Sequence, residues 1–253
     1  MKRIFFILPL VLLVSVSVQG KIYAICIGIS EYELSIPDLT YSHRDAAEMY
    51  EMLKEYTTLD KMKLLTNEQA TYNSILYYTN QLFLQAQPED IVIFFFSGHG
   101  YGNLFYAYDK VLYFDTLYEI FKQTKAKRKV IFADACHSGT LRLPDSQTTS
   151  NDPNSGKYNV LSFLSSRSGQ YSIESIFLGN GTFTYFLLAG LRGGADINKD
   201  DYITAKELFN FVYPKVKEKT DDRQIPVMWG KFDKNMVILN LKASKSNESN
   251  RTD

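Results

Sequence analysis

A histidine and a cysteine, each flanked by glycine, are the residues of this chain best suited to covalent chemistry. His99 lies in Ser-Gly-His-Gly (residues 97–100), and Cys136 lies in Asp-Ala-Cys-His-Ser-Gly (residues 134–139). An imidazole beside a thiol can accept its proton and produce the thiolate, the nucleophilic form of cysteine. Glycines leave the backbone bare, so that a substrate chain can approach it closely. The two motifs predict nucleophilic catalysis by Cys136 with His99 as its base.

Alternatives exist for both residues. A single histidine or cysteine at the end of a strand is often structural, and His137 is a second candidate for the base. Because His137 adjoins Cys136 in the sequence, its side chain is expected to point elsewhere, and His99 is favoured. The backbone N–H groups of Gly100 and Cys136 are the expected donors of an oxyanion hole.

The elements that must position this pair alternate between apolar runs and helical patterns. Continuous apolar strands separated by helices indicate an α/β fold with a mostly parallel sheet covered on both faces. His99 and Cys136 follow successive strands of this kind, and sites in such sheets form at the carboxyl ends of the strands. We expect strands at 22–29, 62–66, 90–96, 129–134, 158–165 and 236–241, and helices at 45–56, 72–86, 115–125, 182–191 and 204–219.

The two ends of the chain are expected to lie outside the folded domain, residues 21–241. Residues 1–20 begin Met-Lys-Arg, continue with an apolar stretch and end in small residues, as is typical of a secretory signal peptide. The alternative is an uncleaved membrane anchor, but the apolar stretch is short for a span of about 20 residues. We therefore expect an exported protein, periplasmic or secreted, with no membrane contact after cleavage and a disordered tail at 242–253.

Composition narrows the class of partner. Lys plus Arg and Asp plus Glu both total 28 in 253 residues, so the formal net charge is zero. A chain without a basic field is not expected to bind nucleic acid. The other cysteine, Cys26, lies in an apolar run and is expected to be a buried free thiol in a monomeric protein.

The chain resembles the caspase-like peptidases, most closely the metacaspase and bacterial caspase-like branch. The resemblance implies a three-layer α/β/α sandwich and peptide-bond hydrolysis through a thioester, with Cys136 attacking, His99 as general acid and base, and no required cofactor. The segment between Gly100 and Tyr113 is shorter than in many relatives, so the resemblance does not define the shape of the cleft near residues 101–109. The matching pieces are 23–30, 44–46, 97–100, 134–139, 179–184 and 207–208.

Acidic residues at positions that match this family imply a specificity for basic residues. Metacaspases cleave after Arg or Lys with acidic pockets, whereas caspases cleave after Asp with basic ones. Here Asp45 and Asp134 match the acidic positions, and Glu174 is a weaker third candidate. Carboxylates can bind a guanidinium group through two parallel hydrogen bonds. The alternative is structural: Asp45 would cap its helix and Asp134 would brace a turn.

The polar stretch that follows the cysteine has two readings. Residues 142–157 are rich in turn formers and are bounded by Arg142 and Lys157. An enzyme specific for basic residues could cleave itself at these two positions. An ordinary surface loop fits the composition equally well.

Residues 196–207 have the ligand spacing of a calcium-binding EF-hand loop. The residue at its sixth position, usually glycine, is Asp201. In the competing interpretation, residues 204–207 form a capping box for the next helix. The calcium loop offers one alternative to a peptidase, a calcium-dependent interaction domain. A second alternative is a binding or signalling module that has the same fold but does not cleave peptides. The expected calcium ligands are Asp196, Asn198, Asp200, Tyr202 and Glu207.

Overall fold

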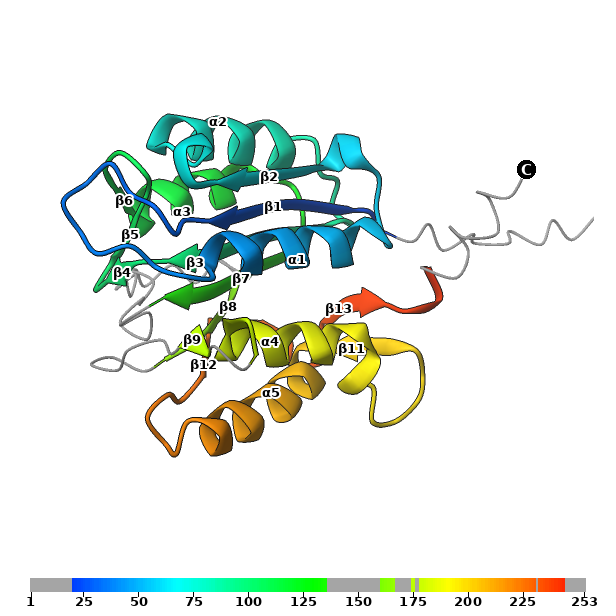
Figure 1. Ribbon diagram of the computed structural model, residues 1–253. Helices are drawn as coiled ribbons and strands as arrows, with labels where there is room; N and C mark the ends of the chain where they lie inside the picture. Colours follow the sequence, from blue (N-terminus) through cyan, green and yellow to red (C-terminus); the bar gives the residue numbers. More distant parts are fainter. Residues whose placement is uncertain (1–19, 136–159, 167–173, 176–177, 231, 244–253) are drawn as a thin grey trace, which may run out of the picture.

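A central six-stranded sheet organises the protein (Figure 1). The computed structural model describes residues 20–135, 160–166, 174–175, 178–230 and 232–243. The strand order is β12-β8-β7-β3-β1-β2, and every neighbouring pair is parallel except β12 with β8. The strands are β1 (Ile22–Gly28), β2 (Met62–Thr66), β3 (Ile91–Gly98), β7 (Arg128–Ala135), β8 (Val160–Leu164) and β12 (Val227–Trp229).

Helices cover both faces of this sheet. On one face lie α1 (Ser42–Lys54), α4 (Thr182–Ala189) and α5 (Ala205–Lys219), which share one core cluster. On the other face lie α2 (Tyr72–Phe83) and α3 (Phe114–Gln123), which belong to a second cluster. The predicted α/β sandwich with a mostly parallel sheet is confirmed. Single turns of helix lie at Leu59–Lys61, Asn67–Gln69 and Gly190–Gly194.

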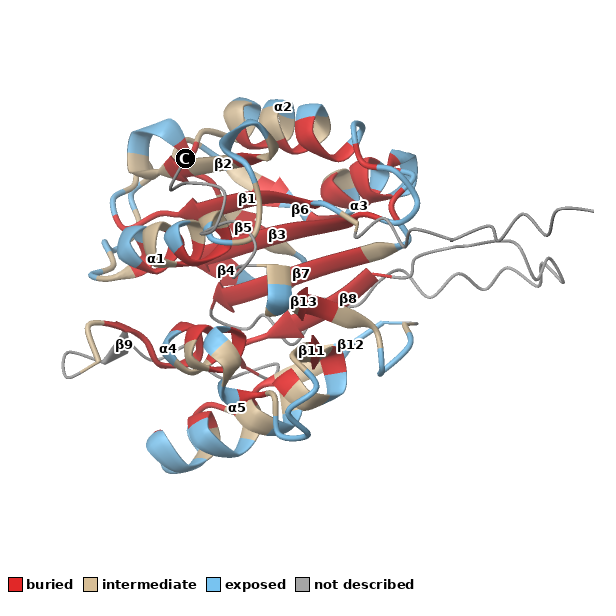
Figure 2. Ribbon diagram, turned by 90° about the vertical axis from the view of Figure 1, so that its right-hand side faces the viewer, coloured by how far each residue is buried: buried red, intermediate tan, exposed pale blue. Residues whose placement is uncertain are grey.

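Strand β1 shows why the sequence contains continuous apolar runs. Tyr23, Ile25 and Ile27 point into the cluster under α2 and α3, whereas Ala24 and Cys26 point into the cluster under α1. Alternate residues of a strand face opposite sides, so a strand covered on both sides is apolar at every position. Figure 2 shows the central strands buried. Cys26 is a fully buried free thiol, as predicted, and burial raises its pKa.

Three small sheets are absent from the sequence-based prediction. Strands β4 (Gly100–Tyr101), β5 (Leu104–Tyr106) and β6 (Val111–Tyr113) form an antiparallel sheet directly after His99. Strands β9 (Glu174–Ser175) and β10 (Asn180–Gly181) form a second. The expected last strand forms as β13 (Val237–Asn240), but it pairs with β11 (Tyr202–Thr204) and not with the central sheet.

No helix within these described ranges is long and apolar enough to cross a membrane. The predicted signal peptide and most of the predicted tail lie outside the described residues.

Candidate active site

The histidine motif and the cysteine motif follow neighbouring parallel strands. In the register of β3 and β7, Ser97 lies opposite Asp134 and Gly98 lies opposite Ala135. His99 is the next residue after β3. Cys136 follows Ala135 but lies outside the described residues, as do Arg142 and Lys157. The topology therefore places the start of both motifs at one edge of the sheet, as the sequence predicted.

The loop between β1 and α1 holds the imidazole of His99. Nε2 of His99 lies 2.7 Å from the carbonyl oxygen of Pro37. Since a carbonyl oxygen only accepts hydrogen bonds, Nε2 carries the proton and Nδ1 is the basic nitrogen. The backbone N–H of His99 donates to the Tyr32 hydroxyl at 2.8 Å, and the two rings lie 5.2 Å apart. A Cβ at Gly98 would lie 2.8 Å from this hydroxyl oxygen, so glycine permits the contact.

Sequence reasoning missed Tyr32 and Pro37. Their loop carries no motif, and its only signal is its position after a strand that ends at the same edge as β3.

Asp45 is buried at this edge and is only 1% exposed. Its carboxylate accepts hydrogen bonds from Ser97 Oγ at 2.8 Å, Asn180 Nδ2 at 3.0 Å and the Gly181 N–H at 3.1 Å. It does not cap α1, so that structural alternative is wrong. Burial raises the pKa of Asp45 well above its usual value, and the negative charge of Asp134 raises it further.

Asp134 shares this buried position and is 4% exposed. Its Oδ2 accepts hydrogen bonds from the backbone N–H and the hydroxyl of Thr184, at 3.1 and 2.8 Å. It therefore braces the first turn of α4. A Cβ at Gly181 would lie 2.3 Å from Asp134 Oδ2 and 3.0 Å from Asp45 Oδ2. The backbone of Gly181 thus lies against both carboxylates.

The backbone of Glu174 lies beside that of Gly181. It pairs with Gly181 in the ladder of β9 and β10. Gly100, an expected oxyanion donor, is buried and pairs with Phe105. The oxyanion hole stays a prediction because its other expected donor, Cys136, is not described.

Comparison with known proteins identifies the family and the fold of this chain. The profile of the caspase domain (Peptidase C14) matches residues 21–237. The chain belongs to the caspase-domain family of peptidases. No curated protein sequence matches this caspase-domain chain significantly.

Solved structures share the fold of this caspase-domain protein at low sequence identity. Caspase-1 from Spodoptera frugiperda is 18% identical with a TM-score of 0.65, and the match covers 85% of this chain and 88% of that one. A protein from Geobacter sulfurreducens is also 18% identical, with a TM-score of 0.64 and coverage of 85% and 94%. The structure of pro-Sf-caspase-1 is 16% identical, with a TM-score of 0.63. These likenesses confirm the predicted caspase-like fold.

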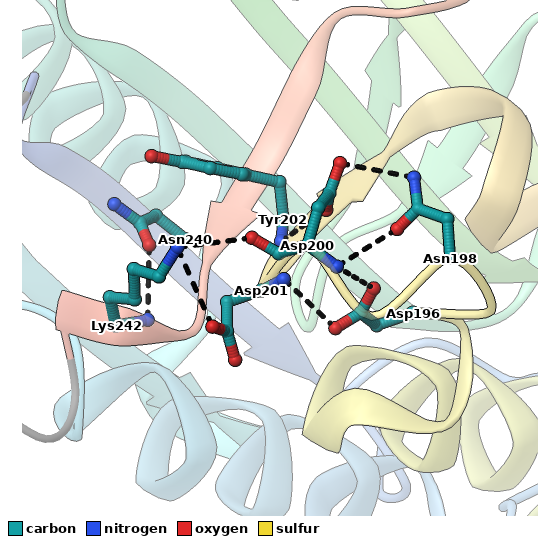
Figure 3. A network of polar contacts seen from close by, with 7 residues as sticks. All are labelled: Asp196, Asn198, Asp200, Asp201, Tyr202, Asn240 and Lys242. Carbon is teal, nitrogen blue, oxygen red and sulfur yellow. Dashed lines mark hydrogen bonds and ion pairs between the residues drawn. The ribbon is translucent and has the colours of Figure 1, made fainter.

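The predicted calcium loop is held together by hydrogen bonds of its own (Figure 3). Asp196 accepts from the backbone N–H groups of Asp200 and Asp201, both at 3.1 Å. Asn198 Oδ1 accepts from the N–H of Asp200 at 3.0 Å, and Asp200 Oδ1 accepts from the N–H of Tyr202 at 2.8 Å. Three of the side chains that would bind a cation therefore accept hydrogen bonds from the backbone of their own loop.

The last expected calcium ligand serves the following helix. Glu207 Oε2 accepts from the backbone N–H and the hydroxyl of Thr204, at 3.0 and 2.7 Å. Thr204 Oγ1 accepts in return from the N–H of Glu207. This confirms the capping box at the start of α5. Among the described residues no group of three or more acidic, histidine or cysteine side chains is arranged to hold a metal ion, and calcium binding stays a prediction.

Proposed function

We propose that this protein is an exported cysteine endopeptidase that uses Cys136 and His99. The family and the fold support this proposal, and the observation that carries it is the register of β3 and β7. That register brings the residues before His99 and Cys136 to neighbouring positions at the edge where parallel sheets form their sites.

The orientation of His99 fits the role of acid and base. With its Nε2 proton bound to Pro37, Nδ1 remains to exchange a proton with the thiol. The Cys136 sulfur attacks the carbonyl carbon of the peptide bond, the carbon–nitrogen bond breaks, and His99 returns the proton to the leaving amine. Water then hydrolyses the thioester and regenerates the thiol.

The proposed specificity is for Arg or Lys before the cleaved bond, through Asp45 and Asp134, with Glu174 as a third carboxylate. Two carboxylates buried close together repel each other when ionised, and a bound cation offsets this repulsion. A guanidinium would displace the backbone of Gly181 from the pair and take over its hydrogen bonds. Arg142 and Lys157 would then also be possible self-cleavage positions.

Hydrolysis of fluorogenic peptides that end in Arg, Lys, Asp or Asn tests the proposal. The mature chain from Lys21 should cleave the Arg and Lys peptides, and Cys136→Ala and His99→Ala should not. Cys26→Ala is the matched control, because this buried thiol lies away from the site and its variant should retain activity. Cleavage only after Asp would contradict the acidic pocket but retain the peptidase. No cleavage of any peptide would favour a non-cleaving module.

A further inference from the structure

The small sheet that follows His99 has two faces of different character. His99 extends β4, because its carbonyl accepts from the N–H of Tyr106 at 3.0 Å. Direct cross-strand partners project to the same face of a sheet, and successive residues alternate between faces. The register therefore assigns two rows to the outer face, His99–Tyr106–Val111 and Tyr101–Leu104–Tyr113, and one row to the inner face, Gly100–Phe105–Leu112.

The inner face anchors the small sheet to the core. Phe105 and Leu112 are fully buried. The ring of Phe105 stacks on Phe96 of β3 with centroids 4.0 Å apart and contacts Phe114 at 4.6 Å. The position of the outer face relative to His99 is therefore fixed by core packing.

The outer face is open and apolar. Tyr101 and Tyr113 are 64% and 52% exposed, whereas Leu104, Tyr106 and Val111 are half-buried. Figure 1 shows β4, β5 and β6 at the end of the molecule where β3 and β7 end. The rings of Tyr106 and His99 meet edge to face, with centroids 6.5 Å apart. The candidate catalytic imidazole is thus part of the same surface.

We propose that this outer face binds the substrate residues that follow the cleaved bond and prefers large apolar or aromatic side chains there. The inference rests on the proposed peptidase function. A general acid must reach the leaving amine, so the leaving segment of the substrate starts at His99. The outer face begins at that imidazole.

The positions of Asp45 and Asp134, the proposed acidic pair, support the placement of the leaving segment over the small sheet. Ala46 and Phe183, next to the pair, belong to the core cluster on the α1 and α4 side of the sheet. Phe105 and Leu112 belong to the cluster on the α2 and α3 side. A substrate lying across the carboxyl edge therefore places its basic residue on one side and its leaving segment on the other, over the small sheet.

The chemistry of this face sets the preference. Apart from His99, its side chains carry no ionisable group that is charged at neutral pH. Tyrosine offers a large contact area at a low cost in side-chain entropy. We expect about a tenfold faster reaction with Phe or Leu than with Gly after the cleaved bond, since an open apolar face captures part of the transfer free energy.

Internally quenched peptides test the inference directly. The series carries Arg before the bond and Phe, Leu, Gly or Asp after it, and an Arg-aminocoumarin amide without a leaving-side residue serves as reference. The double variant Tyr101→Ser/Tyr113→Ser should reduce the Phe-to-Gly ratio of kcat/KM from about ten to about two. Because the ratio is taken within each variant, general changes in turnover cancel. Tyr77→Ser, at a 59% exposed tyrosine on α2, is the control and should keep the ratio.

A positive charge introduced on the outer face should produce a gain of rate for an acidic substrate. Tyr113→Lys should raise the relative rate of the peptide with Asp after the bond, a gain that misfolding does not produce. A wild-type enzyme that cleaves the aminocoumarin but shows equal rates for Phe and Gly would overturn this inference alone. No hydrolysis of the aminocoumarin would overturn the proposed function and this inference with it. A dimer in sedimentation that the double variant dissociates would assign the face to a second copy instead.

Discussion

The two ends of the central sheet both bury aspartate, but they surround it differently. At the amino end, Asp90 is 3% exposed and accepts hydrogen bonds from the backbone N–H groups of Lys21 and Gln87, both at 2.7 Å. The guanidinium of Arg128 lies nearby; burial lowers its pKa, and the charge of Asp90 partly offsets this. Asp90 therefore has backbone donors and a cation in its surroundings.

At the carboxyl end, Asp45 and Asp134 face each other beneath Gly181. The donors described above, from Ser97, Asn180, Gly181 and Thr184, are all neutral, and the charge of Asp134 raises the pKa of Asp45. A cavity of about 460 Å³ also lies at the amino end, lined by residues such as Ile22, Arg128 and Leu239, and thus at the opposite end of the strands from His99. We infer that the aspartate of the amino end serves stability, whereas ionisation of both aspartates at the carboxyl end is unfavourable unless a cationic ligand is bound.

Replacement of the proposed nucleophile should have the largest effect. Cys136→Ala should lower kcat by roughly 10³-fold or more, because the thioester can no longer form. The melting temperature should change little. Peptide hydrolysis and thermal unfolding measured on the same sample check both parts. Activity retained in this variant would show that the reaction does not use Cys136 at the carboxyl end.

Asp45→Asn should separate recognition from stability. We expect roughly a 100-fold loss of cleavage after Arg, because the guanidinium loses a charged partner. The raised pKa means that folded Asp45 binds its proton more tightly than unfolded Asp45, so the wild type loses stability as pH rises from about 4 through the raised value. The asparagine does not titrate.

Thermal unfolding over a range of pH measures this second effect. The melting temperature of the variant, relative to the wild type, should increase with pH. A difference that stays constant with pH would contradict the raised pKa.

Asp90→Asn should give the converse result at the amino end. The substitution weakens two partly buried hydrogen bonds and should cost about 1–3 kcal/mol of unfolding free energy. Denaturant unfolding of the wild type and the variant measures the loss, and kcat/KM of the folded protein should be unchanged. A large fall in kcat/KM with normal stability would contradict the assignment of stability to the amino end and of recognition to the carboxyl end.

Thr204→Ala should have the smallest effect. Loss of the capping box should cost about 1 kcal/mol, and the melting temperature should fall by a few degrees with or without calcium.

The same melting scans test the predicted calcium loop, because bound calcium should raise the melting temperature of the wild type but not of Asp196→Asn. Equal curves with and without calcium would contradict the predicted site.

The sequence predicted the sheet and the edge where the histidine and cysteine motifs start, because the signals there are local. Strands β1, β3 and β7 are continuous apolar runs, and their order along the chain brings the histidine and cysteine motifs together. The small strands were missed because two or three residues are too few to show a period.

The contacts that refine the site could not be predicted either. Tyr32 and Pro37 reach His99 only through tertiary folding of their loop. The close approach of Gly181 to Asp45 and Asp134 likewise joins segments that lie far apart in the sequence.

The alternation of faces in the small sheet also has a consequence for evolution and design. Phe105 and Leu112 on the inner face belong to the core, and their replacement would cost stability. On the outer face, positions 101 and 113 are exposed and position 104 is half-buried, and substitution at such positions is expected to cost less stability than substitution in the core. Selection can therefore diversify the surface beside His99 without disturbing its scaffold, and a library randomised at these three positions should consist largely of folded proteins.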